Sequence, residues 1–289
     1  MKLDNNDPSL NFPLSFSGSI AQLLEEPTGS GHWLLMIDNQ MHSMVDIGDP
    51  SNLLFDYAKK VGKIIEHLFP EKSKINVLHL GGGALTFARY IDSTRPGSSQ
   101  WVIEIEENLI DFVFQTIPMS TKGPTKIHLG DARSVLEEIK QDLYKKIDLV
   151  ISEVFLGPHS AANVSSVEFY RLVASVLSKD GVLVTNIIDD GLHRYVKDQV
   201  VTSNDVFSRA SVLVYRKIDE GTYRNCLMVS SNRQQAHEIA KSSVFEENGI
   251  VGEVIEGLDL EDFSVGGRLI EDKLAYSWPP GGRKNDETY

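Results

Sequence analysis

The sequence predicts an α/β protein built around a doubly wound, mostly parallel sheet. Two patterns carry this prediction: apolar strand-like runs alternate with helical patterns from residue 75 onward, and the connections between them are short. The length of 289 residues suits one large domain with an appendage, or two small domains. We expect an N-terminal β-stranded region over 1–50, a Rossmann-like domain over 51–270 and a disordered tail over 271–289.

The N-terminal region contains short apolar runs separated by turn-forming residues. Residues 19–24 and 31–38 flank Pro27-Thr28-Gly29-Ser30, an arrangement that predicts a β-hairpin. Residues 39–45 form a third candidate strand. Over residues 53–68 the apolar side chains recur at helical spacing, so we expect one helix to lead into the main domain.

The main domain is expected to contain five parallel strands followed by a hairpin. Two late runs, 209–215 and 223–229, flank a polar stretch with Asp219-Glu220-Gly221, which predicts an antiparallel hairpin. Five parallel strands and such a hairpin form the seven-stranded sheet of an S-adenosylmethionine-dependent methyltransferase-like Rossmann fold. Residues 165–168 read Ser-Ser-Val-Glu, a capping box that predicts a helix start. The five strands are expected at residues 75–80, 101–104, 125–129, 147–152 and 182–187.

Composition excludes several classes of partner. The chain carries 28 Lys and Arg residues against 41 Asp and Glu residues, a formal net charge of −13, which argues against broad binding to nucleic acid. The sequence shows neither a secretory leader nor an apolar run near the ~20 residues that span a bilayer, so we expect a cytoplasmic protein without membrane contact. With one cysteine, Cys226, and scattered histidines, neither a disulfide nor a metal site is expected.

Three glycines form the sharpest motif. Gly81, Gly82 and Gly83 follow an apolar strand and precede a helical pattern. Such a turn lets the backbone pass close to a ligand and directs helix N-terminal amides toward it. The glycines alone are equally consistent with a nucleoside site and with a tight turn that binds nothing.

Acidic side chains follow the next two strands. Glu104 ends the second strand, 21 residues after Gly83, where an acidic residue binds ribose hydroxyls in such folds; the alternative is a solvated carboxylate that opens the next helix. Asp131 follows the third strand, where it can accept from an adenine amino group or cap the helix that starts at Ala132. In an open parallel sheet, ligands bind at these carboxyl ends of strands.

The fourth and fifth strands also end in acids. Glu153 could hold a substrate amine or simply start a loop, and Asp189 adds charge to the same edge of the sheet. Together with Glu104 and Asp131 they would line one negative crevice. The apolar loop over 154–164 is expected to be a lid, with a plain surface loop as the alternative.

This ordered set of features resembles the spermidine synthase family. The resemblance covers roughly residues 15–230. It combines a small β-stranded N-terminal piece, a Gly-Gly-Gly turn, a strand-two acid, a Gly-Asp-Ala motif and a strand-four acid before a loop. More narrowly, residues 78–86, 94–98 and 166–170 resemble the spermidine synthase-like proteins of actinobacteria.

The resemblance implies that the protein binds decarboxylated S-adenosylmethionine. The glycine turn would approach the thio-adenosyl group, the strand-two acid would bind the ribose, and the residues after strand three would contact the adenine. The residues concerned are Gly81, Gly82, Gly83, Glu104, Asp131 and Ala132.

The resemblance also implies a reaction. Gln40 and Tyr57 look like the family's N-terminal glutamine and helical tyrosine at the substrate pocket. An aminopropyl group would move from the sulfonium to a polyamine amine, with release of methylthioadenosine. Glu153, helped by Asp189, would position the amine. By analogy with the family we also expect a homodimer.

Departures from the family pattern keep two alternatives open. Ala84 stands where the glycine turn usually carries an aspartate, Leu156 replaces the second of two aspartates, and Ala58-Lys59 replaces a His-Glu pair. A carboxylate at position 84 would attract the ammonium of the decarboxylated donor and repel the carboxylate of intact S-adenosylmethionine. The alternatives are a methyltransferase that uses intact S-adenosylmethionine and a nucleoside-binding protein without catalysis.

Overall fold

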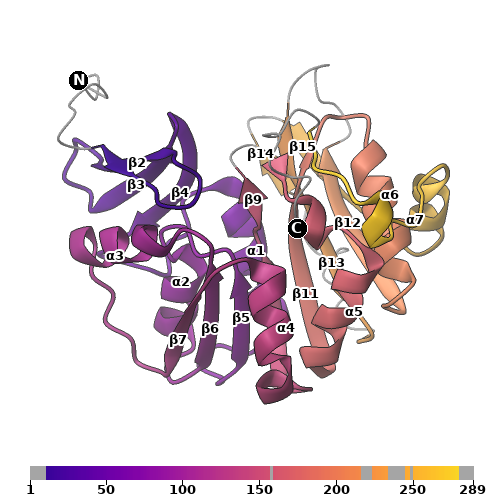
Figure 1. Cartoon of the computed structure of the whole chain (residues 1–289), viewed down its shortest axis with the longest axis horizontal. Coiled ribbons are helices and arrows are strands. Elements are labelled where there is room, and N and C mark those ends of the chain that lie inside the picture. Colours follow the sequence, from indigo (N-terminus) through magenta and orange to yellow (C-terminus); the bar gives the residue numbers. More distant parts are fainter. Residues whose placement is uncertain (1–10, 157–158, 216–222, 234–244, 248–249, 280–289) are drawn as a thin grey trace.

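The computed structural model describes residues 11–156, 159–215, 223–233, 245–247 and 250–279. A large mixed sheet forms the main domain, and a small antiparallel sheet comes from the N-terminal region (Figure 1). The described chain therefore has the α/β architecture that the alternation of strand and helix patterns predicts.

The large sheet has the expected parallel strands and closing hairpin. Within the described residues it contains nine strands in the order β14-β15-β12-β13-β11-β8-β5-β6-β7. The strands β7, β6, β5, β8 and β11 are parallel, and β13 runs antiparallel to both β11 and β12. This confirms the methyltransferase-like Rossmann fold with its closing hairpin. The strands are β5 (Asn76–Leu80), β6 (Ser99–Glu104), β7 (Thr125–Leu129), β8 (Ile147–Ser152), β11 (Leu177–Asp189), β12 (Arg209–Tyr215), β13 (Arg224–Ser231), β14 (Phe245–Glu247) and β15 (Ile250–Glu256).

Two of these strands were not expected from the sequence. β15 pairs with β12, and β14 pairs with β15, so the sheet continues past the seven predicted strands. Residues 245–256 mix acids and glycine with the apolar residues, which obscures the period of two that marks a strand. The turn of the predicted hairpin, Asp219–Gly221, lies outside the described residues.

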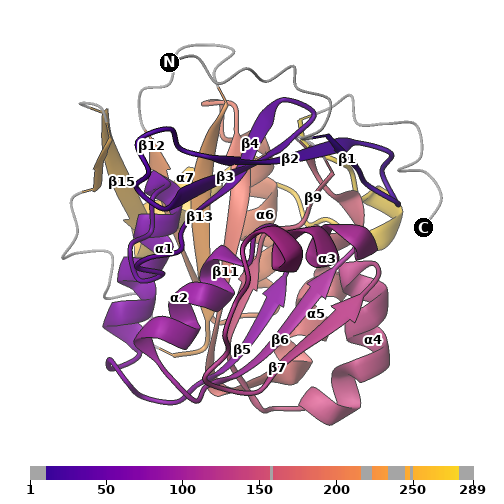
Figure 2. The same cartoon turned by 90° about the vertical axis from the view of Figure 1, so that its left-hand side faces the viewer.

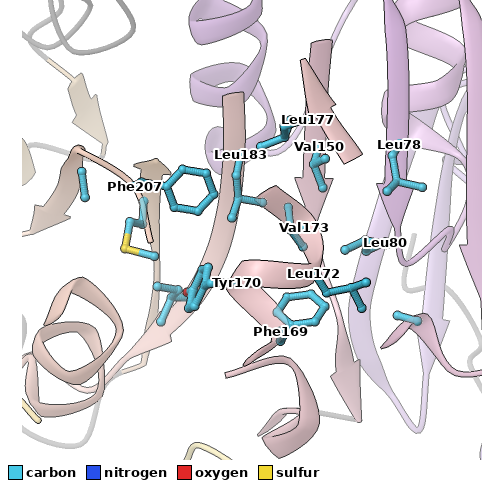
Figure 3. Close-up of a cluster of buried hydrophobic side chains, with 14 of the residues drawn as sticks. Leu78, Leu80, Val150, Phe169, Tyr170, Leu172, Val173, Leu177, Leu183 and Phe207 are labelled. Carbon is cyan, nitrogen blue, oxygen red and sulfur yellow. The ribbon is translucent and has the colours of Figure 1, made fainter. Parts of the chain in front are cut away.

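Helices cover both faces of the large sheet. On one face, side chains of α1 and α2 pack with the strands in a buried apolar cluster; on the other, α4, α5 and α6 form a second cluster. Figure 3 shows part of the second cluster, where Phe169, Tyr170 and Val173 of α5 lie against Val150 and Leu183 of the sheet. The helices are α1 (Asp56–Leu68), α2 (Thr86–Thr94), α3 (Glu107–Thr116), α4 (Ala132–Leu143), α5 (Val167–Val176), α6 (Arg194–Asn204) and α7 (Gly257–Ser264).

The predicted capping box differs from the structure by one residue. Ser166, not Ser165, is the N-cap of α5, and its Oγ accepts from the backbone N–H of Phe169 at 3.3 Å. The carboxylate of Glu168 accepts instead from the backbone N–H of Asp272 at 3.0 Å. The Glu168 carboxylate therefore binds the C-terminal segment instead of the first residues of α5.

The N-terminal sheet lies across the end of the large sheet where β5 and β6 finish (Figure 2). Hydrogen bonds join the two parts. Ser43 Oγ accepts from the N–H of Ala84 at 3.3 Å, the Glu106 carboxylate accepts from the N–H groups of Phe16 and Ser17 at 2.9 and 2.8 Å, and the Asn108 amide donates to the Pro13 carbonyl at 2.7 Å. The expected hairpin and third strand are present, together with one more short strand. The strands are β1 (Phe12–Pro13), β2 (Ile20–Glu25), β3 (His32–Ile37) and β4 (Gln40–Asp46).

Part of the expected disordered tail is packed against the main domain. In η4 (Asp272–Leu274), the Asp272 carboxylate takes two hydrogen bonds from the Arg133 guanidinium, at 2.6 and 2.8 Å. Trp278 stacks on Tyr195 with ring centroids 6.0 Å apart, and its backbone bridges to Ser160. The proline, glycine and charge content of the tail suggested disorder, but these side chains anchor residues 271–279. Residues 280–289 lie outside the described residues.

The described chain can also be compared with the expectations for Cys226, for membrane-spanning helices and for metal sites. Cys226 is buried in β13, as expected for a strand thiol. Among the described residues, no helix combines the length and apolar character needed to cross a bilayer. Nor do three or more His, Cys, Asp or Glu side chains gather there in an arrangement that could hold a metal ion.

A buried arginine closes the end of α1. Arg95 is 1% exposed, and its guanidinium donates to the carbonyls of Ile65 and Phe69 at 3.2 and 2.6 Å. The Ile65 carbonyl also accepts from the Phe69 N–H at 2.9 Å, so the main contribution of Arg95 is its bond to the Phe69 carbonyl just past the helix end.

We predict that Arg95→Met destabilises the protein by about 2 kcal/mol, because the Phe69 carbonyl loses the guanidinium that donates to it. The matched control is Arg171→Met, which removes an exposed ion pair with Asp205 and should cost less than about 1 kcal/mol. Urea unfolding of both variants measures the two costs. Equal costs would contradict the role assigned to Arg95.

Candidate active site

A cavity of about 1210 Å³ lies between the N-terminal sheet and the carboxyl ends of the parallel strands. This is the position at which open α/β sheets bind their ligands, and the volume is ample for a nucleoside together with a second small molecule. Among the residues that line it are Gln40, Tyr57, Gly81, Gly82, Gly83, Glu104, Asp131, Ala132 and Glu153, all singled out from the sequence.

The glycine turn lies directly against the end of β8. Gly81 has φ +90°, and a Cβ atom placed on it would be 2.4 Å from the carbonyl oxygen of Glu153. Only glycine tolerates both the left-handed conformation and this close approach. The turn is held from both sides, since Gly81 N–H donates to the Ile103 carbonyl at 2.9 Å and Glu153 N–H donates to the Leu80 carbonyl at 2.8 Å.

Glu104 is tied to the same turn. One carboxylate oxygen accepts from the N–H groups of Gly82 and Gly83, at 2.7 and 3.2 Å, and the other accepts from Glu106 N–H at 2.9 Å. The side chain is 7% exposed and lines the cavity, so it is not a solvated carboxylate at a helix start. The carboxylate therefore links the glycine turn to the start of α3 at the cavity wall.

Asp131 caps α4 and lines the cavity at the same time. One oxygen accepts from Ser134 N–H at 2.8 Å, and the other accepts from the Asn163 side-chain amide at 2.7 Å. The N-cap alternative for this residue is therefore confirmed. Ala132, the first residue of α4, is nearly buried beside it.

Glu153 forms a polar cluster on the cavity wall with two side chains from other elements; Asn186 is buried, and Glu153 and Tyr57 are half-buried. The Asn186 side-chain amide of β11 donates to Glu153 Oε1 at 3.1 Å, and the Tyr57 hydroxyl of α1 hydrogen-bonds to the same carboxylate. Burial raises the pKa of Glu153 to about 7, while the hydrogen bonds from Asn186 and Tyr57 act in the opposite direction. A carboxyl group with this pKa can accept a proton near neutral pH.

The N-terminal sheet contributes the other wall of the cavity. Gln40, at the start of β4, lines the cavity and is exposed. His42, two residues along the strand, lines it as well; burial lowers its pKa against the opposing effect of Asp38, which favours a neutral imidazole at pH 7. Sequence reasoning missed His42, which lies where the pairing of β3 and β4 shifts register, so strand alternation does not place it.

Asp189 is not where the sequence predicted it. Among the described residues that line the cavity, β11 supplies Asn186 and Ile188, and Asp189 is absent. It is 2% exposed, and its Oδ2 lies 2.5 Å from Nδ1 of His193. Side chains alternate along a strand, so Asp189 faces away from Asn186 and Ile188. The predicted crevice of four acids therefore keeps Glu104, Asp131 and Glu153.

Ala84 and Leu156 are two of the positions at which the sequence departs from the family pattern. Ala84 is completely buried in an apolar cluster with Leu85 and Ala88, beside the cavity rather than on its wall. Leu156 lies in β9 (Phe155–Leu156), which pairs with β10 (His159–Ser160) where the sequence predicted a lid loop. Residues 157–158, including the expected Gly157 hinge, lie outside the described residues.

The strand order and the place of the cavity define a methyltransferase-type Rossmann protein with a nucleoside-sized site. Residues 57–238, more than half of the chain, match the spermine/spermidine synthase domain, and the chain belongs to this family. The match includes Tyr57, the glycine turn, Glu104, Asp131 and Glu153.

Known relatives are distant. The polyamine aminopropyltransferases of two Neisseria meningitidis strains are 22% identical over 147 residues, which is 50% of this chain and 54% of each relative. A solved structure of a probable spermidine synthase from Corynebacterium glutamicum is 23% identical, with a TM-score of 0.78 over 90% of this chain and 95% of that one. A spermidine synthase in complex with the transition state analogue AdoDATO is 14% identical, with a TM-score of 0.54 over 82% and 78%. These structures share the fold.

We predict that Gly81→Ala destabilises the protein and weakens methylthioadenosine binding, because the added methyl group meets a backbone carbonyl. Gly266→Ala is the matched control, since Gly266 has φ +85° and open space around its Cβ position. Both substitutions place alanine at a positive φ and carry the strain of the left-handed conformation. The free energy of unfolding in urea should fall by about 2 kcal/mol more for Gly81→Ala than for Gly266→Ala. Identical costs would contradict the close contact between the glycine turn and Glu153.

Proposed function

We propose that the protein is an aminopropyltransferase that moves the aminopropyl group of decarboxylated S-adenosylmethionine to an amine. The observation that carries this proposal is the position of Glu153. Its backbone touches the glycine turn, and its carboxyl group, with a pKa of about 7, meets Tyr57 within the same cavity. A nucleoside donor on the turn and an amine at this carboxyl group would lie side by side.

The donor would occupy the half of the cavity near β5, β6 and β7. The backbone of Gly81, Gly82 and Gly83 would border the donor, Glu104 would accept from the ribose hydroxyls, and Asp131 with Ala132 would border the adenine. The fit rests on the glycine turn, which lines the cavity, and on the Glu104 carboxylate that is bonded to it. The family membership and a solved neighbour that carries AdoDATO support the same class of ligand.

The acceptor would lie on the other side of Glu153, near Tyr57 and Gln40. An alkyl amine has a pKa of ~10 and is almost entirely protonated at pH 7, so it must lose a proton before it can attack. Glu153 accepts that proton. The amine nitrogen then forms a bond to the carbon next to the sulfonium, the carbon–sulfur bond breaks, and methylthioadenosine leaves with the electron pair.

Methyl transfer from intact S-adenosylmethionine is the second candidate. The departure at position 84 favours it: where the family pattern has an aspartate this chain has Ala84, buried beside the cavity, so no carboxylate stands there to repel the carboxylate of the intact donor. Glu153 would deprotonate an amine acceptor in the same way, so the two candidates differ in the donor and share the base.

We predict that Glu153→Gln lowers the rate of aminopropyl transfer by about 10²–10⁴-fold, because the neutral amide cannot accept the amine proton. Methylthioadenosine affinity, measured by calorimetry, should stay close to that of the unchanged protein, since the side chain faces the acceptor. Turnover with decarboxylated S-adenosylmethionine and an amine is followed by mass spectrometry. A variant that keeps full turnover would eliminate Glu153 as the base.

The pH dependence provides an independent test. The base must be ionised, so kcat/KM should rise with pH, with an apparent pKa of about 7, and level off above it. The Tyr57 hydrogen bond favours the ionised carboxylate, so Tyr57→Phe should raise that pKa and move the rise to higher pH. A profile that does not move in Tyr57→Phe would show that another group titrates.

A further inference from the structure

The C-terminal segment over residues 268–279 is bonded to the main domain along its length. It follows the residues 57–238 that match the family domain. The Asp198 carboxylate of α6, which is 4% exposed, accepts from the Arg268 backbone N–H at 2.8 Å and from the Tyr276 hydroxyl at 2.7 Å. A buried carboxylate needs such donors, so these bonds fix the path of the segment over α6.

A chain of hydrogen bonds joins the middle of this segment to Asp131, which follows β7. The Asn163 side-chain amide donates to Asp131 at 2.7 Å, and the Asn163 carbonyl accepts from Arg133 at 3.2 Å. The Arg133 guanidinium also donates to both carboxylate oxygens of Asp272, at 2.6 and 2.8 Å. All four residues line the cavity. Asp272 therefore belongs to the same stretch of cavity wall as Asp131.

The ion pair of Arg133 with Asp272 orients the segment. Two parallel hydrogen bonds fix a carboxylate in the plane of a guanidinium, which a single bond does not do. The Ser166 hydroxyl donates to the same carboxylate at 2.5 Å, and the hydrogen bonds from Arg133 lower the pKa of Asp272, so the pair is ionised at pH 7. η4 begins at Asp272, and Ala275, which comes directly after η4, also lines the cavity.

We propose that residues 272–275 form the wall of the nucleoside site on the adenine side, and that Arg133 positions them. This inference rests on the proposed function, which places the adenine beside Asp131. The Asp272 carboxylate already accepts three hydrogen bonds, and Ala275 presents a methyl group, so the segment covers the base by packing rather than by charge. A flat base that packs on such a wall loses water from its face, which strengthens binding.

Alkylation of an introduced thiol tests whether the segment borders the nucleoside. Ala275→Cys places the thiol on the cavity wall. Leu274→Cys is the matched control, since Leu274 is 56% exposed and is not among the described residues that line the cavity. The chain's one natural cysteine, Cys226, is buried, and burial raises the pKa of its thiol, so it reacts slowly. With methylthioadenosine at 100 times its Kd, about 1% of the protein is free, so iodoacetamide should modify Ala275→Cys at least about tenfold more slowly and Leu274→Cys at an unchanged rate.

The outcomes distinguish this inference from the proposed function. Methylthioadenosine binding, measured by calorimetry, without slower alkylation of Ala275→Cys would overturn this inference alone, and so would equal slowing of both variants. Slower alkylation of Ala275→Cys in a protein that transfers no aminopropyl group would contradict the proposed function alone. If Ala275→Cys loses methylthioadenosine binding at an unchanged Tm while Leu274→Cys still binds, the added sulfur occupies the place of the nucleoside, which supports the inference. No methylthioadenosine binding by the unchanged protein would overturn both.

The positioning role of the ion pair is tested from its carboxylate. Asp272→Ala releases the segment from Arg133 and should weaken methylthioadenosine binding by about fivefold. Glu271→Ala is the matched control, because it removes an exposed ion pair with Lys273 from the same segment and should change the affinity by less than about twofold. A merely structural role would lower the Tm and leave the shielding of position 275 intact, whereas we expect that shielding to fall when Asp272→Ala is combined with Ala275→Cys. Equal affinities of the two single variants, or shielding that does not fall, would overturn this role.

Discussion

The close approach of Gly81 to Glu153 is the constraint on which the rest of the site depends. A backbone carbonyl lies where the Cβ of any other residue would be, so β5 and β8 end in contact. This contact places the glycine turn beside a carboxyl group from the neighbouring strand, on the wall of one cavity. The same arrangement allows Glu104 to reach over the glycines and leaves Glu153 for a different partner.

The N-terminal sheet turns this open edge into a cavity. Ser43 reaches the glycine turn, and Glu106 holds the chain ahead of β2, so the small sheet is fixed over the carboxyl ends of β5 and β6. Glu153 lies on the wall of this cavity, and its burial raises its pKa to about 7.

Local sequence signals account for much of this architecture. Short stretches of chain mark the glycine turn, Glu104 21 residues after Gly83, and the alternation of strands and helices. The structure places these features at the strand ends where the sequence predicted them. The position predicted for Asp189 differs from the structure because it depends on which face of β11 the side chain occupies. A shift of one residue along a strand reverses that face. The packed segment over 271–279 and the strands β14 and β15 depend on partners distant in sequence. Asn186 and its bond to Glu153 likewise required the parallel register of β8 and β11.

The most direct test of the account is thermal unfolding in the presence of methylthioadenosine, decarboxylated S-adenosylmethionine and intact S-adenosylmethionine in parallel. A ligand that binds the folded state at 100 times its Kd adds about 2.7 kcal/mol of stability. The account predicts that methylthioadenosine and the decarboxylated donor each raise Tm, and that the decarboxylated donor does so more than the intact one. A larger shift with the intact donor would favour methyl transfer. No shift with any of the three would contradict a nucleoside site at the glycine turn.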